Sequence, residues 1–153
     1  MASGWYQSGL SKILDGTIDL DTSTLKVMLL SDEYTYNPDH DFVDDLTAGS
    51  GEVSATNYTG GYGGAGRKTA TISLSVDNTN NRVVGTITDL TWTALGGASN
   101  DVVAGAALVR EITNDAASVP IAYFDFTNFT TNGSDVTLDF ATSGSGGNLQ
   151  INC

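Results

Sequence analysis

The segment Asp39–Asp45 gathers four carboxylates around the only histidine of the chain, His40. Oxygen-rich loops can bind calcium, but an EF-hand needs acidic ligands at alternate positions, a glycine at the sixth position and a final glutamate. This segment has neither that glycine nor that glutamate. We therefore predict no metal and no cofactor here, and expect a capped helical turn with solvated carboxylates and Phe42 with Val43 or Leu46 turned inward.

Catalysis by a nucleophile needs a base and an orienting group beside it. With one histidine and a terminal Cys153, no Cys–His pair is persuasive, and no Gly-x-Ser-x-Gly elbow stands between a strand and a helix. The glycine-rich run Gly60–Gly66 lacks the Gly-Lys-Ser/Thr ending of a P-loop and is better explained as a flap that orders against a neighbour. We expect no catalytic residue and no enzymatic activity; a small hydrolase that uses His40 remains a third alternative.

Aromatic side chains at exposed places can mark binding surfaces. The candidate partner contacts are Trp5, Tyr6, Tyr58 and Tyr62. For Trp5 and Tyr6 the alternative is that they cover one end of the domain's own core. A carbohydrate platform built from the tyrosines of the long loop is a further alternative.

The charge of the chain excludes several partners. Eighteen acidic and six basic side chains give a net charge of -12, and only Arg67 and Lys68 are adjacent among the basic residues. Nucleic-acid binders cluster Lys and Arg against phosphates, so neither nucleic acid nor an anionic membrane surface is an expected partner. No apolar run reaches the roughly 20 residues that span a bilayer, and the start lacks the features of a signal peptide. Synthesis in the cytoplasm follows as the expectation.

The elements that must position these residues begin with a helix over Gly4–Leu14. Tyr6, Leu10, Ile13 and Leu14 recur at helical spacing and would share one face, with Ser3 as the cap and Gly16 as the left-handed end. The length of 153 residues predicts one domain over 1–153, with a long loop at about 31–66.

Period-two patterns then predict strands. Leu25–Leu30 would be covered on both faces, whereas Thr69–Val76 would turn Ala70, Ile72, Leu74 and Val76 toward the core. The polar run Asp77–Asn81 predicts a turn that pairs Thr69–Val76 with Arg82–Thr88 as a hairpin. Further strands are expected at Val102–Arg110, Val119–Phe126, Asp135–Phe140 and Leu149–Ile151, with a glycine–serine linker at Ser143–Gly147. The fold class is therefore mainly β, an antiparallel β-sandwich or barrel with a short N-terminal helix.

Several motifs follow one another in an order and spacing that suggest a family. They are Asp15–Thr22 with Leu25–Leu30, His40–Phe42 with Asp44 and Asp45, Glu52–Ser54, Tyr58–Gly61, Asp77–Arg82, Leu90–Trp92 and Pro120–Phe126. In these motifs the chain resembles the small virion structural proteins of tailed bacteriophages, above all capsid decoration or cement proteins. The likeness spans Trp5 to about Phe140, while the glycine-rich insertion at Tyr62–Gly66 and the Cys153 ending depart from the pattern.

This resemblance implies a structural, non-enzymatic virion protein made in the host cytoplasm and attached to the outer surface of an assembled capsid. Its partners would be the major capsid protein and further copies of itself, commonly as a homotrimer. The acidic charge suits the outside of a shell, away from packaged DNA. The alternative is a structural or receptor-binding module associated with a tail, baseplate or fibre. No functional residue set is carried over from the family.

Overall fold

A computed structural model describes residues 3–140 and 148–152 of the chain. The fold is mainly β, with 42% strand and 12% helix, and every strand pair is antiparallel. The predicted linker Ser143–Gly147 and Cys153 lie outside the described residues. No closed barrel forms within 3–140 and 148–152, so of the two expected architectures the sandwich-like one is compatible with the structure.

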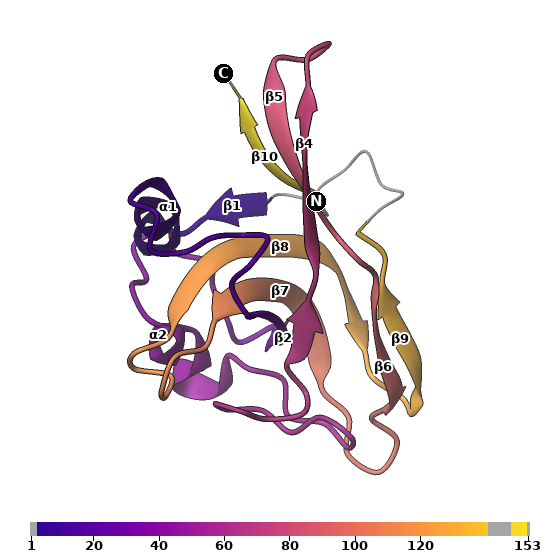
Figure 1. The fold of residues 1–153 in the computed structure, drawn as a ribbon. Helices are drawn as coiled ribbons and strands as arrows, with labels where there is room; N and C mark the ends of the chain where they lie inside the picture. Colours follow the sequence, from indigo (N-terminus) through magenta and orange to yellow (C-terminus); the bar gives the residue numbers. More distant parts are fainter. Residues whose placement is uncertain (1–2, 141–147, 153) are drawn as a thin grey trace.

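The body of the protein is built on a five-stranded sheet in the order β1-β8-β7-β2-β3 (Figure 1). Its strands are β1 (Ser3–Trp5), β8 (Val119–Thr130), β7 (Val102–Arg110), β2 (Leu25–Ser31) and β3 (Lys68–Ala70). β2 is buried along nearly its whole length, as its unbroken apolar sequence predicts for a strand covered on both faces.

Two hydrophobic clusters cover the two faces of this sheet. On one face Leu25, Val27 and Leu29 pack in the larger cluster with Trp92 and Phe140. On the other face Met28 and Leu30 pack in a smaller cluster with Tyr6, Val43 and Leu46. Because side chains alternate along a strand, one apolar run supplies both clusters.

Two smaller sheets complete the fold. β10 (Asn148–Asn152), β5 (Arg82–Ile87) and β4 (Ile72–Asp77) form one, and β6 (Leu90–Leu95) pairs with β9 (Ser134–Leu138) in the other. In Figure 1 the β4–β5 hairpin and β10 rise above the body as an arm. The hairpin and its polar turn are confirmed, with Asn81 at a φ of 51°.

The single strand expected over Thr69–Val76 is wrong. The chain leaves the central sheet after Ala70, breaks at Thr71 and enters the arm as β4. Ala70 and Ile72 are buried as predicted, but Leu74 and Val76 are 48% and 71% exposed, because the arm carries them beyond the body. The apolar alternation correctly predicts a strand with these side chains on one face. It does not predict whether other residues cover that face.

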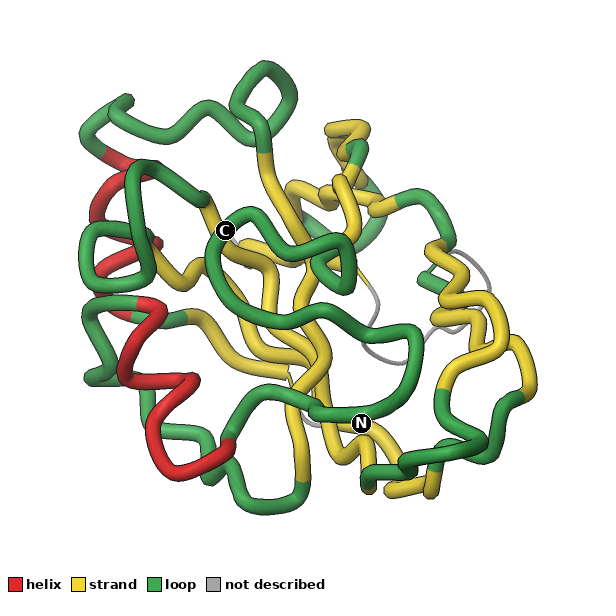
Figure 2. Tube along the Cα trace, turned by 90° about the horizontal axis from the view of Figure 1, so that it is seen from below, coloured by secondary structure: helices red, strands yellow, loops and turns green. Residues whose placement is uncertain are grey.

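The N-terminal helix is confirmed with shorter bounds, as α1 (Gln7–Leu14). Ser3 is not its cap, because it lies in β1, and Leu14 is 76% exposed although Tyr6 is fully buried. Gly16 ends the helix in the left-handed conformation as expected, with a φ of 78°. Figure 2 shows α1 and the second helix, α2 (Val43–Thr47), on the same side of the molecule.

The long loop at about 31–66 contains the predicted helical turn as α2, followed by the 3-10 turn η1 (Ala48–Ser50). The Asp45 carboxylate accepts the backbone N–H groups of Asp41 and Phe42 at 3.0 and 3.1 Å, which caps the turn. Val43 and Leu46 are buried, but Phe42 is 45% exposed, so its inward placement is wrong. β6 was not predicted as a strand; near its end Ala94 adopts a φ of 48°, and the pairing with β9 shifts register between Trp92 and Leu95.

Gly9 explains how α1 packs on the sheet and gives a first prediction. A Cβ atom at Gly9 would lie 2.3 Å from the Pro120 carbonyl oxygen and 2.6 Å from Ile121 Cα. Alanine normally stabilises a helix by about 1 kcal/mol over glycine, but overpacking a close contact costs about 1–3 kcal/mol. We therefore expect Gly9→Ala to lower the midpoint of thermal unfolding.

Ser11→Ala, at an exposed position of the same helix, is the matched control and should leave the midpoint unchanged or slightly higher. A higher midpoint for Gly9→Ala as well would contradict the close packing of α1 on β8.

Candidate functional site

The four aromatic candidates fall into different environments. Trp5 is half-buried against the larger cluster and donates its indole N–H to the Gln150 carbonyl oxygen at 3.3 Å. Tyr6 is fully buried in the smaller cluster, and its hydroxyl lies 2.7 Å from that of Tyr34. The alternative that Trp5 and Tyr6 cover the domain's own core is therefore confirmed.

Tyr58 and Tyr62 differ sharply although they lie close in sequence. Tyr58 is buried, whereas Tyr62 is 47% exposed. The expected exposure was thus wrong for Tyr58, because its ring fills space beneath a loop that the sequence could not place. Of the four candidates, Tyr62 alone presents a largely exposed ring to the surface.

The other loop tyrosines pack on the sheet. The rings of Tyr36 and Tyr123 stack with centroids 4.9 Å apart, and Tyr34 lies 5.9 Å from Tyr123. His40 is held in the same group, with Nδ1 3.1 Å from the Tyr34 hydroxyl. These ring contacts fasten the start of the long loop to β8.

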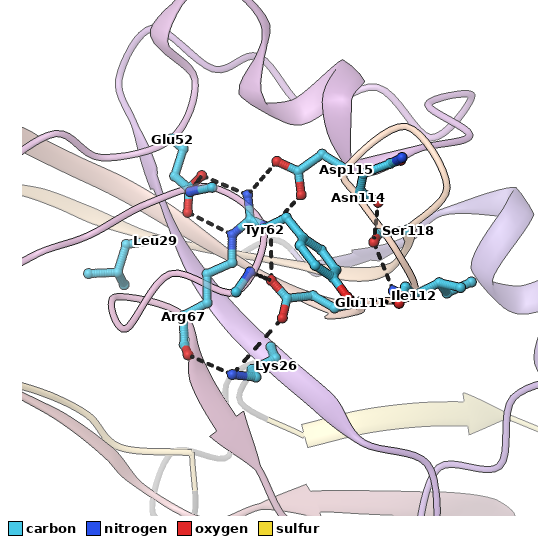
Figure 3. Close-up of polar contacts among 12 residues, drawn as sticks. Lys26, Leu29, Glu52, Tyr62, Arg67, Glu111, Ile112, Asn114, Asp115 and Ser118 are labelled. Carbon is cyan, nitrogen blue, oxygen red and sulfur yellow. Dashed lines mark hydrogen bonds and ion pairs between the residues drawn. The ribbon is translucent and has the colours of Figure 1, made fainter.

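The most densely bonded polar group of the structure surrounds Arg67, and we call Arg67, Glu52, Glu111 and Asp115 the arginine clasp (Figure 3). The Arg67 side chain has no exposed surface. It donates from Nε and Nη2 to the two Glu52 oxygens at 2.8 and 2.7 Å, and from Nη1 and Nη2 to the two Asp115 oxygens at 2.6 and 3.0 Å. A fifth bond runs from Nη1 to Glu111 at 3.1 Å. All of the guanidinium's nitrogens are therefore paired.

Glu52 is fixed from its other side as well. Its Oε1 accepts the Tyr58 hydroxyl at 3.0 Å, and its Oε2 accepts the Gly61 backbone N–H at 2.9 Å. The Tyr58 oxygen in turn accepts the Leu29 backbone N–H at 3.0 Å. The clasp thus ties the long loop to β2, which lies between β7 and β3 in the main sheet.

The glycine-rich run Gly60–Gly66 folds onto the same group. Gly63 donates its backbone N–H to Glu111 at 3.1 Å, and the Tyr62 hydroxyl donates to the Ile112 carbonyl oxygen at 2.9 Å. A Cβ atom at Gly66 would lie 2.8 Å from the Tyr58 ring. The run therefore orders against its own chain in this structure, and it displays Tyr62.

The charge balance of the clasp favours a fixed, ionised arginine. Three carboxylates face one guanidinium, and Lys26 adds a second cation 4.0 Å from Glu111. Burial alone would lower the pKa of Arg67, but its hydrogen bonds to Glu52 and Asp115 outweigh burial and raise that pKa above the ordinary value.

The clasp was not predicted from the sequence, because Arg67 appeared there only as one of six scattered basic residues. Its acidic partners come from positions 52, 111 and 115, and no local spacing joins them. The one available signal was an arginine directly after a glycine-rich run, in a chain with three acidic residues for each basic one.

The chemistry available to this group is limited by its own bonds. Both oxygens of Glu52 and both of Asp115 already accept hydrogen bonds from Arg67. Within the part of the chain that the structure describes, no group of three or more His, Cys, Asp or Glu side chains could hold a metal ion. The clasp is therefore suited to holding a surface in shape.

Comparison with models of protein families, with curated proteins and with solved structures found no match to this chain. No helix among the described residues is long and apolar enough to cross a membrane.

Breaking the clasp should cost much of the protein's stability. Arg67→Leu would leave three carboxylates without their buried partner, and removing one member of a buried ion pair costs about 3–5 kcal/mol. Arg67→Lys keeps the charge but loses the two-pronged geometry, so its cost should be intermediate. Urea unfolding followed by circular dichroism measures both.

The control is Arg82→Leu, which removes the more exposed pair with Asp77, 2.8 Å apart. Exposed pairs contribute about 0–1 kcal/mol. Equal losses for Arg67→Leu and Arg82→Leu would contradict the central place of the clasp.

Two buried tyrosines predict how stability depends on pH. Burial is the main cause that raises the pKa values of Tyr6 and Tyr58 above the ordinary value of about 10. The neighbouring Tyr34 adds to this effect at Tyr6, and Glu52 adds to it at Tyr58. The folded phenols stay protonated while those of the unfolded chain ionise. The free energy of unfolding should therefore be fully retained below pH of about 10 and decline as the pH rises above it.

Tyr58→Phe removes one of these groups. Above pH of about 10 the free energy of unfolding of the variant should therefore decline less steeply than that of the wild type, with slopes that differ by up to about 1.4 kcal/mol per pH unit. Below pH of about 10 the free energy of unfolding of the variant should be lower than that of the wild type by a constant amount, because the hydrogen bonds of the hydroxyl are missing. Parallel curves for the variant and the wild type at all pH values would contradict this assignment.

Proposed function

We propose that this chain is a structural protein of a tailed-phage virion that decorates the outer face of the capsid and stabilises it. Its partners in this proposal are the major capsid protein and further copies of itself, as a homotrimer. The order of motifs from Trp5 to about Phe140 supports the family, and the mainly β fold is compatible with it.

The observation that carries the proposal is how the structure uses its charged and aromatic side chains. The arginine clasp and the buried tyrosines hold loops in place, while Tyr62 remains on the surface. A small fold whose densest polar group fixes its own surface loops is suited to making contacts of constant shape. The net charge of -12 repels polyanions and so favours a place away from packaged DNA.

The mechanism would be stabilisation by many weak contacts. A small subunit repeated over a shell links neighbouring capsid subunits, and linked contacts gain strength from high effective concentration without any single strong bond. Internal pressure from packaged DNA then has to break several contacts at once. Glu52 and Asp115 would act here only indirectly, by holding the loop that displays Tyr62.

The direct test is binding of the purified chain to empty, expanded shells that lack it. We expect co-sedimentation that saturates at a fixed number of copies per shell, and a rise in the temperature at which the shells disrupt. Shells of the unexpanded form are the matched control, because their surface subunits are arranged differently.

No binding to shells, together with inhibition of host adsorption by the free chain, would overturn the proposal in favour of a receptor-binding module of a tail, baseplate or fibre. Tyr62→Ser separates the contact from the fold, since this half-exposed ring can be removed without opening a core. A role for Tyr62 in the contact predicts weaker shell binding by this variant at unchanged thermal stability.

A further inference from the structure

Six of the seven large hydrophobic side chains exposed among the described residues fall into two patches. Of the seven large ones exposed among residues 3–140 and 148–152, Leu74, Val76 and Val83 lie on the arm. Phe42, Tyr62 and Ile112 lie together elsewhere, since Phe42 and Ile112 line one pocket and the Tyr62 hydroxyl bonds the Ile112 carbonyl oxygen. The seventh, Leu14, belongs to neither patch.

The arm patch continues the core into solvent. Ile72, opposite Ile87, is buried at the base of the hairpin. Further out on the same face, Leu74 pairs with Gly85 and Val76 pairs with Val83, and these side chains are exposed. An apolar face that begins in a core and ends uncovered is a surface for a partner rather than an ordinary scatter of surface residues.

The arm is also electrically neutral within an acidic chain. From Ile72 to Ile87 it carries one acid, Asp77, and one base, Arg82, and these two pair with each other at 2.8 Å. The negative charge on the rest of the surface opposes contact between two copies. A neutral arm is therefore the place where a second copy is repelled least.

The second patch surrounds a pocket of about 410 Å³, which we call the basic pocket. Ile18 and Val119 form buried parts of its wall, Phe42 and Ile112 its exposed parts, and Lys12 and Arg110 also line it. Among the described residues neither Lys12 nor Arg110 has a carboxylate within ion-pair distance. Arg110 donates one bond to the Thr17 carbonyl oxygen at 2.6 Å.

Two cations with no ion pair to a described carboxylate are unusual in one pocket of a chain with three times as many acidic as basic residues. Asp15 is close enough to Lys12 for the lysine to contribute to its lowered pKa, but hydrogen bonds from Thr17 are the larger cause. The pocket therefore offers apolar walls and free positive charge to an occupant with an apolar tip and polar acceptors.

The arm has that chemistry at its end. Val76 and Val83 form its last apolar pair, and the turn beyond them carries the amide oxygens of Asn78, Asn80 and Asn81. We propose that the arm of one copy docks in the basic pocket of a second copy, head to tail. This inference deepens the self-association in the proposed function, on which it rests for its biological setting.

Head-to-tail contact between two different patches makes a ring when the rotation closes. A stable interface buries about 800 Å² on each partner, which is more than three exposed side chains supply. A contact between the same arm of two copies, related by a two-fold axis, would therefore fall short. An arm that enters a pocket also covers the pocket walls, and every copy in a ring then uses both patches.

Complementation between two variants tests this arrangement. The arm variant is Val76→Ser with Val83→Ser, and the pocket variant is Ile112→Ser with Lys12→Glu. The control is Leu14→Ser, which removes the most exposed hydrophobic side chain of the described residues outside both patches. Molar mass is measured by light scattering, after circular dichroism and thermal unfolding show that each variant is folded.

We expect the wild type and Leu14→Ser to form a closed oligomer, and each patch variant to self-associate at least about tenfold more weakly. An equimolar mixture of the two patch variants should give a dimer, because one intact arm still meets one intact pocket. A mixture that stays monomeric overturns the proposal, and so does a pocket variant that assembles normally, since arms would then pair with arms.

A monomeric wild type also overturns this inference. Shell binding by that monomer would support the proposed function without the head-to-tail contact. A head-to-tail oligomer that does not bind shells would support the contact and contradict the proposed function. The two ideas therefore fail separately.

Discussion

One buried guanidinium holds together three segments that lie far apart in the sequence. Arg67 has no exposed side-chain surface, so its charge must be met inside the protein, and three carboxylates from distant positions meet it. Satisfying that charge brings the long loop, the glycine-rich run and the β7–β8 connection to one point. Tyr58 then joins the group to the backbone of Leu29, in strand β2 of the main sheet. The surface that displays Tyr62 and Ile112 depends on this arrangement.

The fold was predictable wherever apolar residues alternate. β2, β7, the hairpin and the N-terminal helix follow from local spacing, and so does the turn capped by Asp45. The spacing of apolar residues predicted the structure wrongly where tertiary contacts determine the path of the chain. It joined β3 and β4 into one strand, because nothing local marks Thr71 as the point where the chain changes sheets. It also placed Leu74 and Val76 in a core, since an uncovered apolar face and a covered one have the same pattern.

The candidate site was less predictable than the fold. Aromatic residues in a loop suggest exposure, yet Tyr58 is buried because the glycine-rich run packs against its ring. The arginine clasp depends on pairs separated by 15 to 48 positions, which one sequence does not reveal. Together, the clasp fixes the loops from the interior and the surface carries two exposed apolar patches. This arrangement is compatible with the proposed assembly role.

The central claim is that this chain acts by binding to the outside of a capsid. A cryo-EM reconstruction of the intact virion tests it most directly, because the 42% strand fold with its projecting arm is recognisable in density. We expect this fold at repeated positions on the outer face of the shell, with each arm against a neighbouring copy. Density for the chain confined to the tail or baseplate, with a bare shell, would contradict it.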